Sequence, residues 1–415
     1  MKTDVIVLGA GIVGVCAALH LQDRGQRVVL LDRRGPGEET SFGNAGLIQS
    51  ASIVPYGFPR NVGDLMRYAR NNSTSLHYDL KSLPSFARWL ARYWWESSPE
   101  RLAAAGRDML PLISSSVSEH DKLIARAGLQ YLVRPSGWLE AYRTKEIFER
   151  ETLVAHELAR QHGLGLEVLD AAGLRAMEPA LNSGYAGAVH WLDPKTISDP
   201  GALTKGYAKL FEAGGGTLAR GDALTLSKAA DEWTVLAESG PLSAKTVVLA
   251  LGPWSDQVFR KFGYRIPLMS KRGYHMHYAR PGVEQLKLPV IDIEEGFAVA
   301  PMDRGIRIST GVEIAKRGMQ PTPIQLDRAE GKARSIFGLG ERLDERPWLG
   351  MRPCTPDMRP VIGRAPHHPG LWFSFGHNHH GFTLGPGSGR LLAEMVVGNA
   401  PFVDPSAFRP ERFHN

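Results

Sequence analysis

The stretch that decides the fold is VIVLGAGIVGVCAALHLQDRGQRVVLLDRR, which runs from Val5 to Arg34. It opens with a β-favouring apolar run that predicts a strand over residues 4–9, because glycine stops the run. The segment 12–23 is rich in Ala and Leu and predicts a helix that is ended by Gly25. Residues 28–31 predict a second strand, so the stretch as a whole predicts a βαβ unit.

A GxGxxG pattern lies between the first strand and the helix. Its first glycine allows the tight turn, its second lets a pyrophosphate approach the backbone, and its third lets helix and strand pack closely. The free N–H groups and the dipole of the helix start favour the negative charge of a diphosphate. Asp32 closes the second strand, where its carboxylate can accept hydrogen bonds from both ribose hydroxyls and would repel the 2′-phosphate of NADP. The cofactor-binding candidates of this unit are Gly9, Gly11, Ile12, Val13, Gly14, Asp32 and Arg33.

The βαβ unit by itself leaves FAD and NAD open as ligands. The next segment, EETSFGNAGLIQS over residues 38–50, is small, polar and glycine-containing. Its backbone can follow a ligand that extends beyond the pyrophosphate, and FAD reaches further into a protein than a nicotinamide does. The segment therefore favours FAD.

The composition limits the number of domains and the partners, compartment and metal sites that can be expected. The chain has 415 residues, enough for more than one domain of roughly 100–200 residues. Its net charge is +6, but the arginines are dispersed, so nucleic acid is not an expected partner. Two cysteines form neither a metal-ligand pattern nor a disulfide framework, which predicts a reducing cytoplasm. The histidines His377, His379 and His380 lack an acidic partner nearby in the sequence, so no metal site is expected.

The alternation of segments predicts an α/β fold in which a Rossmann-like FAD-binding domain is interleaved with an α+β substrate domain that contains a mixed antiparallel sheet. We expect residues 1–85, 150–264 and 341–415 in the first domain, and 86–149 and 265–340 in the second. Residues 132–144 predict a hairpin that turns at Pro135–Gly137. Residues 83–95 predict an amphipathic helix whose apolar face is formed by Leu83, Phe86, Leu90, Tyr93 and Trp94.

Four stretches carry a resemblance to a known family: VLGAGIVG, ETSFGNAG, MRPCTPDMRPVIG and FGHNHHGFTLGPGSGR. They extend from one end of the chain to the other. The sequence resembles the glycine oxidase and D-amino-acid oxidase superfamily of flavoproteins, and most closely its bacterial D-amino acid dehydrogenase branch. Related sarcosine oxidases attach their flavin through a cysteine at the position occupied here by Gly350, so the resemblance implies non-covalent FAD.

The resemblance also implies where the cofactor would be contacted. The ETSxxNAG loop would lie along the flavin, VVLALGPWS and the strand near residue 223 would contact the adenosine half, and backbone N–H groups of GHNHHGFTL would face the flavin pyrimidine. The residues placed in this way are Ser41, Asn44, Ala45, Gly46, Ala223, Ala250, Gly252, Gly376, His377, Gly381, Phe382, Thr383 and Leu384.

Three further residues are candidates for substrate binding. Arg352, in GMRPCTPD, resembles the arginine that holds the substrate carboxylate, and the alternative is a structural ion pair with Asp357. Tyr274 could offer its hydroxyl to the same carboxylate, or be an ordinary strand tyrosine. Glu313 is a candidate for binding the substrate amine.

The resemblance implies oxidative deamination of D-amino acids to 2-oxo acids and ammonia by hydride transfer to FAD, with electrons passed to a quinone or another acceptor. Within enzymes, the alternative substrates are hydroxy-D-proline, D-proline or sarcosine. An NAD-dependent dehydrogenase and a non-catalytic flavoprotein are the other classes considered. For the helix predicted at 83–95, the alternatives are peripheral contact with the inner membrane and packing inside the protein or in a homo-oligomer.

Overall fold

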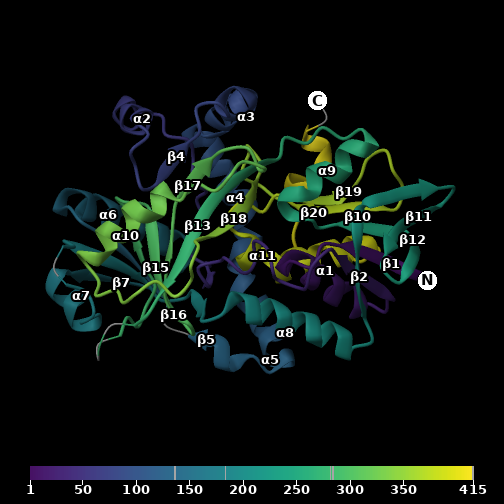
Figure 1. Ribbon diagram of the computed structural model, residues 1–415, viewed down its shortest axis with the longest axis horizontal. Helices are drawn as coiled ribbons and strands as arrows, with labels where there is room; N and C mark the ends of the chain where they lie inside the picture. Colours follow the sequence, from purple (N-terminus) through teal and green to yellow (C-terminus); the bar gives the residue numbers. More distant parts are fainter. Residues whose placement is uncertain (135–136, 183, 281, 283–284, 414–415) are drawn as a thin grey trace.

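The computed structural model describes residues 1–134, 137–182, 184–280, 282 and 285–413. It has a mixed α/β fold in two halves that lie side by side, each built around one large sheet (Figure 1). The chain passes repeatedly between the two halves, since each sheet contains strands from early and late in the sequence. The α/β class and the interleaving predicted from the sequence are confirmed.

The expected βαβ unit forms the centre of the first sheet. Strand β1 pairs in parallel with β2 on one side and with β12 on the other. Along β1, Val5 and Val7 face one core while Ile6 and Leu8 face another, as the two-residue repeat of a strand buried on both faces requires. The seven strands of this sheet are β1 (Lys2–Leu8), β2 (Val28–Asp32), β10 (Thr217–Ala229), β11 (Glu232–Ala237), β12 (Gly240–Leu249), β19 (Val361–Arg364) and β20 (Leu371–Phe375).

Helices cover one face of this sheet in two layers. Helix α1 is buried along almost its whole length, because it lies between the sheet and the outer helices. The helices on this face are α1 (Ile12–Gln22), α4 (Pro99–Ser114), α5 (Ser116–Ala127), α8 (Pro200–Ala213) and α11 (Gly381–Val396). The short helix α9 (Ser255–Phe259) packs on the opposite face.

The second half is a mixed sheet of ten strands, most of them antiparallel. Its strands are β4 (Leu76–Tyr78), β6 (Trp138–Tyr142), β7 (Leu166–Asp170), β8 (Gly187–Trp191), β13 (Met269–Tyr278), β14 (Val290–Asp292), β15 (Phe297–Met302), β16 (Gly305–Ser309), β17 (Val312–Ile314) and β18 (Trp348–Cys354). Helices α6 (Lys145–His162), α7 (Ala171–Met177) and α10 (Ile324–Arg334) belong to this half. A three-stranded sheet joins β3 (Leu47–Ile48), β9 (Lys195–Ile197) and β5 (Val133–Arg134).

The sequence boundaries of the two domains need correction. Strands β4, β7, β8 and β18 fall in segments that were expected in the FAD-binding domain, yet all four pair within the ten-stranded sheet. Local apolar runs predict a strand but not its pairing partner, which depends on contacts distant in sequence. The predicted hairpin at 132–144 is also wrong, because β5 and β6 pair in different sheets. Its turn includes residues 135–136, which lie outside the described residues.

The amphipathic helix is present as α3 (Leu83–Glu96), next to the short helix α2 (Val62–Ala69) at the top of Figure 1. Trp89 and Tyr93 are buried, with Leu83, Phe86 and Leu90 packed around them. Trp94 was expected on this face, but the structure leaves it 42% exposed. The buried face is therefore centred on Trp89, one residue before Leu90, and the rest of the prediction holds.

Two glycines of α11 allow it to pack closely against α1. A Cβ at Gly385 would lie 3.0 Å from Ile12 Cγ1, and a Cβ at Gly389 would lie 2.6 Å from the Cys16 backbone carbon. Side chains at these positions would push the helices apart, because the obstructing atoms at Gly389 belong to the backbone. The close packing sets the positions at which both helices begin.

Replacing Gly389 by alanine should destabilise the protein. The added methyl group meets the α1 backbone, and overpacking of this kind costs about 1–3 kcal/mol. Gly331→Ala is the matched control, since Gly331 lies in α10 with open space around it and alanine is the better helix former. We expect Gly389→Ala to lower the unfolding temperature of the FAD-saturated protein in a thermal melt, and Gly331→Ala to preserve or raise it. Equal melting temperatures for the two variants would contradict the packing role.

Candidate active site

A cavity of about 700 Å³ extends along the junction of the two halves. This volume lies within the range of roughly 300–1,000 Å³ that is usual for cofactor and ligand sites. Most of the residues predicted from the sequence line it: Gly9, Gly11, Ile12, Val13, Asp32, Arg33, Ser41, Asn44, Ala45, Ala223, Ala250, Gly252, Tyr274, Arg352, His377, Gly381 and Phe382. The structure thus brings together residues that are more than 300 positions apart in the sequence.

One end of the cavity is formed by the start of α1. Gly9 has a φ of 105°, and a Cβ there would lie 2.5 Å from the Ala250 carbonyl oxygen, so only glycine allows this turn. No side chain caps the helix at Gly11, and its first turn carries no acidic residue. The Ser41 hydroxyl accepts a hydrogen bond from the Ile12 N–H at 2.9 Å. Ser41 thus binds one of the first N–H groups of α1, and the helix start, which faces the cavity with no acidic residue in its first turn, fits a diphosphate.

Asp32 lies beside this helix start, at the end of β2. Its two carboxylate oxygens accept hydrogen bonds from the N–H groups of Ala10 (2.7 Å) and Arg34 (2.9 Å), which orient it along the cavity wall. Arg33 packs over the Trp254 ring at 4.5 Å and pairs with Glu39 at 2.7 Å. A carboxylate held in this way retains lone pairs for ribose hydroxyls, as the sequence predicts.

The loop 41–46 is held along the cavity by its own side chains and by one from a distant part of the chain. Asn44 Oδ1 accepts hydrogen bonds from the N–H groups of Gly46 (2.8 Å) and Leu47 (3.2 Å), so this side chain stabilises its own turn. The buried Arg307 donates to the Phe42 and Asn44 carbonyls, and burial lowers its pKa to about 10. Thr40 Oγ1 donates to the Met351 carbonyl at 2.8 Å. These hydrogen bonds within the protein hold the loop in place without a bound ligand.

The second helix start at the cavity belongs to α11. Gly381 and Phe382 line the cavity, and first-turn N–H groups have no partner within a helix. Leu384 was expected to offer its N–H as well, but that group donates to the His380 carbonyl at 2.8 Å and the side chain is buried in the core. The Thr383 hydroxyl binds the Leu47 carbonyl and the Gln49 N–H, which ties α11 to β3. We therefore keep Gly381 and Phe382 as flavin-facing candidates and remove Leu384.

Three predicted glycines do not line the cavity, and each has a structural role. A Cβ at Gly14 would lie 1.8 Å from the Gly9 carbonyl oxygen, so Gly14 permits the close packing of α1 on β1. Gly46 has a φ of 77° and lies against the Ile197 backbone, and Gly376 has a φ of 79° at the end of β20.

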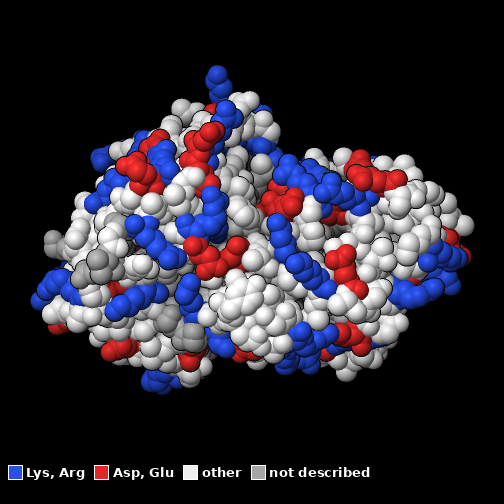
Figure 2. Space-filling model, turned by 60° about the horizontal axis from the view of Figure 1, so that its bottom comes forward, with Lys and Arg blue, Asp and Glu red and all other residues white. Residues whose placement is uncertain are grey.

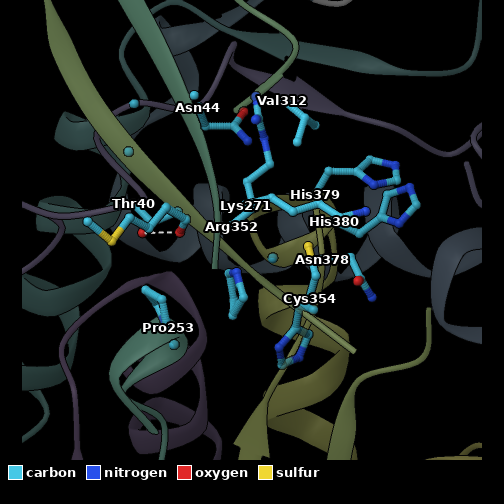
Figure 3. Close-up of a pocket in the computed structure, with 18 of the residues that line it drawn as sticks. Thr40, Asn44, Pro253, Lys271, Val312, Arg352, Cys354, Asn378, His379 and His380 are labelled. Carbon is cyan, nitrogen blue, oxygen red and sulfur yellow. Dashed lines mark hydrogen bonds between the residues drawn. The ribbon is translucent and has the colours of Figure 1, made fainter. Parts of the chain in front are cut away.

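Arg352 lies in the cavity without a carboxylate partner in the part of the chain that the structure describes. Its Nη1 donates to the Gly311 carbonyl (2.9 Å) and its Nη2 donates to the Thr310 carbonyl (3.2 Å). Asp357, the alternative partner considered above, pairs instead with Arg412 at 2.7 Å. The guanidinium has room because Gly273 lies beneath it, where a Cβ would come within 2.5 Å of Nη1. Figure 3 shows Arg352 and Lys271 at the centre of the cavity.

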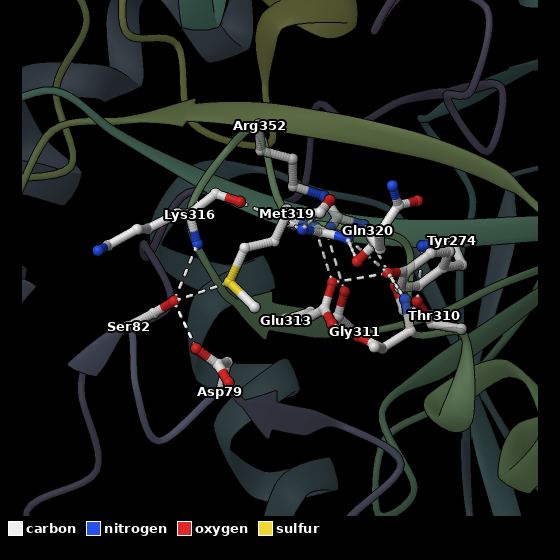
Figure 4. Close-up of polar contacts among 12 residues, drawn as sticks. Asp79, Ser82, Tyr274, Thr310, Gly311, Glu313, Lys316, Met319, Gln320 and Arg352 are labelled. Atoms are coloured by element: carbon white, nitrogen blue, oxygen red, sulfur yellow. Dashed lines mark hydrogen bonds and ion pairs between the residues drawn. The ribbon is translucent and has the colours of Figure 1, made fainter.

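Tyr274, which lines the cavity, and Glu313 belong to one polar cluster (Figure 4). The Tyr274 hydroxyl donates to Glu313 Oε2 at 2.7 Å and accepts hydrogen bonds from the Thr322 N–H (2.7 Å) and from Arg272 Nη2 (3.0 Å). Glu313 also pairs with Arg272 at 2.8 Å, and both side chains are almost fully buried. This geometry does not favour substrate binding by either residue, because the phenol and the carboxylate are already bound by protein groups. For Tyr274 it agrees with the alternative of a strand tyrosine.

The cavity also holds histidines, and burial keeps them neutral. His377 Nε2 lies 3.0 Å from Ser388 Oγ, and burial lowers the pKa of His377 to about 3. The rings of His379 and His380 lie 3.8 Å apart, and burial together with nearby positive charges holds the pKa of His379 well below its usual value. Among the described residues, no three His, Cys, Asp or Glu side chains are grouped so that they could hold a metal ion.

Trp348 and Lys271 are among the cavity residues that the sequence reasoning missed. Trp348 lies against Gly43 and Gly350, where a Cβ on either glycine would overlap the indole ring. Lys271 reaches into the cavity from β13. Strand alternation within SKRGYHMHY separates Lys271 from Arg272, but it does not say which of the two faces the cavity.

The geometry fits a class of protein that binds a dinucleotide at two helix starts, which open into one cavity that also holds two cations. Comparison with known proteins gives the family. The description FAD dependent oxidoreductase (DAO) matches residues 4–395, and the chain belongs to this family. The recognition of the D-amino-acid oxidase superfamily, of the enzyme class and of FAD as cofactor is thus confirmed.

Similar proteins cover nearly the whole chain. A D-amino acid dehydrogenase of Rhizobium johnstonii is 32% identical over 96% of this chain and 97% of that protein. A D-amino-acid oxidase of Bradyrhizobium diazoefficiens is 30% identical over 99% of this chain and 98% of that protein. The crystal structure of glycine oxidase from Geobacillus kaustophilus superimposes with a TM-score of 0.77 at 19% identity and covers 99% of both chains, a likeness that establishes the fold alone.

Replacing Gly11 by alanine should weaken FAD binding without unfolding the protein. A Cβ at Gly11 meets only Ser41 Oγ, at 3.4 Å, and otherwise occupies the space beside the helix start where a diphosphate would lie. We expect the dissociation constant of FAD to rise about tenfold or more, since the close contacts of several charge-assisted hydrogen bonds are lost. Fluorescence titration of apoprotein with FAD measures the constant, and the melting temperature of the apoprotein serves as the folding control. Unchanged FAD affinity would place the diphosphate elsewhere.

Proposed function

We propose that this protein catalyses the FAD-dependent oxidative deamination of D-amino acids to 2-oxo acids and ammonia. The observation that carries the proposal is the Arg352 guanidinium, which lies in the cavity with only backbone carbonyls as partners in the described structure. A buried cation without an anionic partner is unfavourable, so the site favours an anion such as an α-carboxylate. The names of the relatives support the choice of D-amino acids.

Arg352 performs the main positioning step in this proposal. Its two Nη atoms are held by the Gly311 and Thr310 carbonyls, and this fixes the plane of the guanidinium before the substrate arrives. The substrate carboxylate then accepts paired hydrogen bonds from the remaining donors, an arrangement that lysine cannot provide. Pinning one substituent of Cα limits the directions in which the Cα–H bond can point. Much of the expected rate enhancement comes from this orientation.

Bound FAD supplies a two-electron acceptor for the hydride of the Cα–H bond. The amine loses a proton as the C=N bond forms, and water then hydrolyses the imino acid to the 2-oxo acid and ammonia. No protein base is required when the amine binds in its neutral form. The start of α11 at Gly381 and Phe382 places partial positive charge at the cavity, where it would stabilise negative charge on the reduced cofactor.

We further propose that FAD is held without a covalent bond. Gly350 occupies the position at which the related sarcosine oxidases carry their cysteine, and it offers no nucleophile. Both cysteines, Cys16 and Cys354, are buried, and burial raises the pKa of each thiol, so neither favours the reactive thiolate.

A quinone is the proposed electron acceptor, with peripheral contact at the inner membrane as the proposed route to it. Helices α2 and α3 carry exposed apolar side chains next to the cavity, including Val62 (69% exposed), Met66 (59%) and Trp95 (57%). Arg60 packs over the Trp94 ring at 4.2 Å, so a basic and an aromatic group lie together on this surface, as suits contact with anionic lipids.

No helix within the described ranges has both the length and the apolar character needed to span a membrane. On the face seen in Figure 2, basic and acidic side chains are intermixed.

Anaerobic bleaching of the flavin tests the proposed reaction directly. We expect D-amino acids to reduce the bound flavin, seen as loss of its visible absorbance, and L-amino acids not to do so. Cyclic imino acids and N-methyl amines form the comparison panel, since hydroxy-D-proline, D-proline and sarcosine are the alternative substrates. Bleaching by those compounds alone would replace the proposal with the alternative. A colourless protein, or bound flavin that no compound reduces, would reject both.

Arg352→Ala should raise KM steeply and lower kcat while FAD remains bound. Loss of a charge-assisted pair with the carboxylate should lower kcat/KM by roughly a hundredfold or more. Arg364→Ala is a suitable control, because Arg364 is an exposed arginine on β19 and does not line the cavity. Steady-state kinetics and the bound-flavin spectrum of both variants check the expectation. Near-normal turnover in Arg352→Ala would remove this residue from the site.

A further inference from the structure

A second cation lies beside Arg352 in the same cavity. Strands β13 and β18 pair in antiparallel register, with Lys271 directly opposite Arg352. Directly opposite residues of an antiparallel pair project from the same face of the sheet, with Cβ atoms about 4.5–5.5 Å apart. Both side chains line the cavity, and Figure 3 shows them between Asn44 and Val312 on one side and His379 and His380 on the other. Like charges in this arrangement are destabilising unless an anion lies between them or next to both.

In the part of the chain that the structure describes, Lys271 has aromatic partners but no acidic one. Its ammonium lies 4.0 Å from the centre of the Tyr93 ring and 5.2 Å from the centre of the Trp89 ring, both on α3. Within the described residues, no carboxylate lies within ion-pair distance of Lys271. The two rings orient the ammonium, and because they carry no net charge they leave its own uncompensated.

The acidic residues that line the cavity do not offset this charge. Asp32, Glu39 and Asp222 lie at the dinucleotide end, where Glu39 is paired with Arg33 and Asp222 Oδ1 accepts a hydrogen bond from the Leu224 N–H. Asp292 lines the cavity as well, but it pairs with Arg143 at 2.7 Å and accepts a hydrogen bond from the Tyr185 hydroxyl at 2.9 Å. The substrate end of the cavity therefore holds two cations for which the described chain supplies no counter-charge. A single α-carboxylate would neutralise only one of them.

Another polar group at the same end of the cavity has no partner. His379 Nε2 is buried without a hydrogen-bond partner in the described structure, and its ring lies 5.0 Å from that of Tyr56. His379 is close enough to Lys271 and Arg352 for both charges to lower its pKa. A neutral imidazole can donate one hydrogen bond to an oxygen that also contacts an ammonium.

We propose that the preferred substrates are acidic D-amino acids, with the α-carboxylate bound by Arg352 and the side-chain carboxylate bound by Lys271. The inference rests on the proposed function, since it names the substrate class of that reaction. A second carboxylate would pair the charge of Lys271 and remove the repulsion between the two cations. The competing role for Lys271 is to stabilise charge on the reduced flavin, which would affect acidic and neutral substrates equally.

Kinetics on matched substrate pairs test this inference. D-glutamate against D-glutamine, and D-aspartate against D-asparagine, differ in charge at nearly constant shape. We expect the wild-type protein to favour the acidic member by about tenfold or more in kcat/KM, as a charge-assisted contact predicts. Lys271→Met should abolish the preference by lowering activity on the acidic member, and Lys271→Arg should restore part of it. Lys145→Met is the control, because Lys145 is an exposed lysine on α6 and its loss should leave the preference unchanged.

Binding of a non-reactive ligand provides a readout that is independent of turnover. Glutarate should raise the melting temperature of the holoenzyme more than butyrate does, and Lys271→Met should remove the difference while its bound-flavin spectrum stays normal. Equal loss of activity on acidic and neutral substrates in Lys271→Met would overturn the inference in favour of the flavin role. If neutral D-amino acids reduce the flavin and acidic ones do not, the inference fails while the proposed function stands. If no D-amino acid reduces it, the proposed function itself fails.

Discussion

The close packing of α1 against α11 is the constraint on which the rest of the site depends. Gly385 and Gly389 let the two helices approach until backbone meets backbone, and Gly14 presses α1 onto the sheet. Both helices consequently begin at the same cavity, although their starts are separated by most of the chain. The first-turn N–H groups of both helices then face one cavity, an arrangement suited to a long cofactor with an anionic middle and an electron-accepting end.

The second sheet supplies the substrate end through strand register. The pairing of β13 with β18 puts Arg352 over Gly273 and beside Lys271, so one pair of strands provides both the cations and the room for them. The opposite face of β13 carries the buried pair of Arg272 and Glu313, in which the charges are matched and further hydrogen-bonded. On this face of β13 the charges of Arg272 and Glu313 are paired with each other. The other face carries the two cations, which favour binding of an anion.

The residues that a local motif specifies line the cavity. Gly9, Gly11, Asp32 and Ser41 lie where the pattern and the resemblance imply, because their roles follow from a turn, a helix start and a strand end. Tyr274 and Glu313 were assigned to the substrate because both types can bind it. Their assignment failed on orientation, since Tyr274 shares its face of β13 with Arg272 and not with Lys271. The N–H of Leu384 was assigned one residue too far into the helix, at the point where intrahelical bonding begins.

The sequence by itself determined the βαβ unit and predicted a dinucleotide site at its turn, because a strand end, a turn and a helix start depend on residues close together in the chain. Its resemblance to a known family pointed to Arg352 as an anion-binding candidate. Only the tertiary structure decided which strands share a sheet, that Asp357 pairs with Arg412, and that Lys271 lies next to Arg352 with no counter-charge among the described residues. The physical reason is that strand pairing, burial and ion pairing join residues distant in sequence. A charged side chain is available to bind an ionic ligand only when no protein group of opposite charge pairs with it.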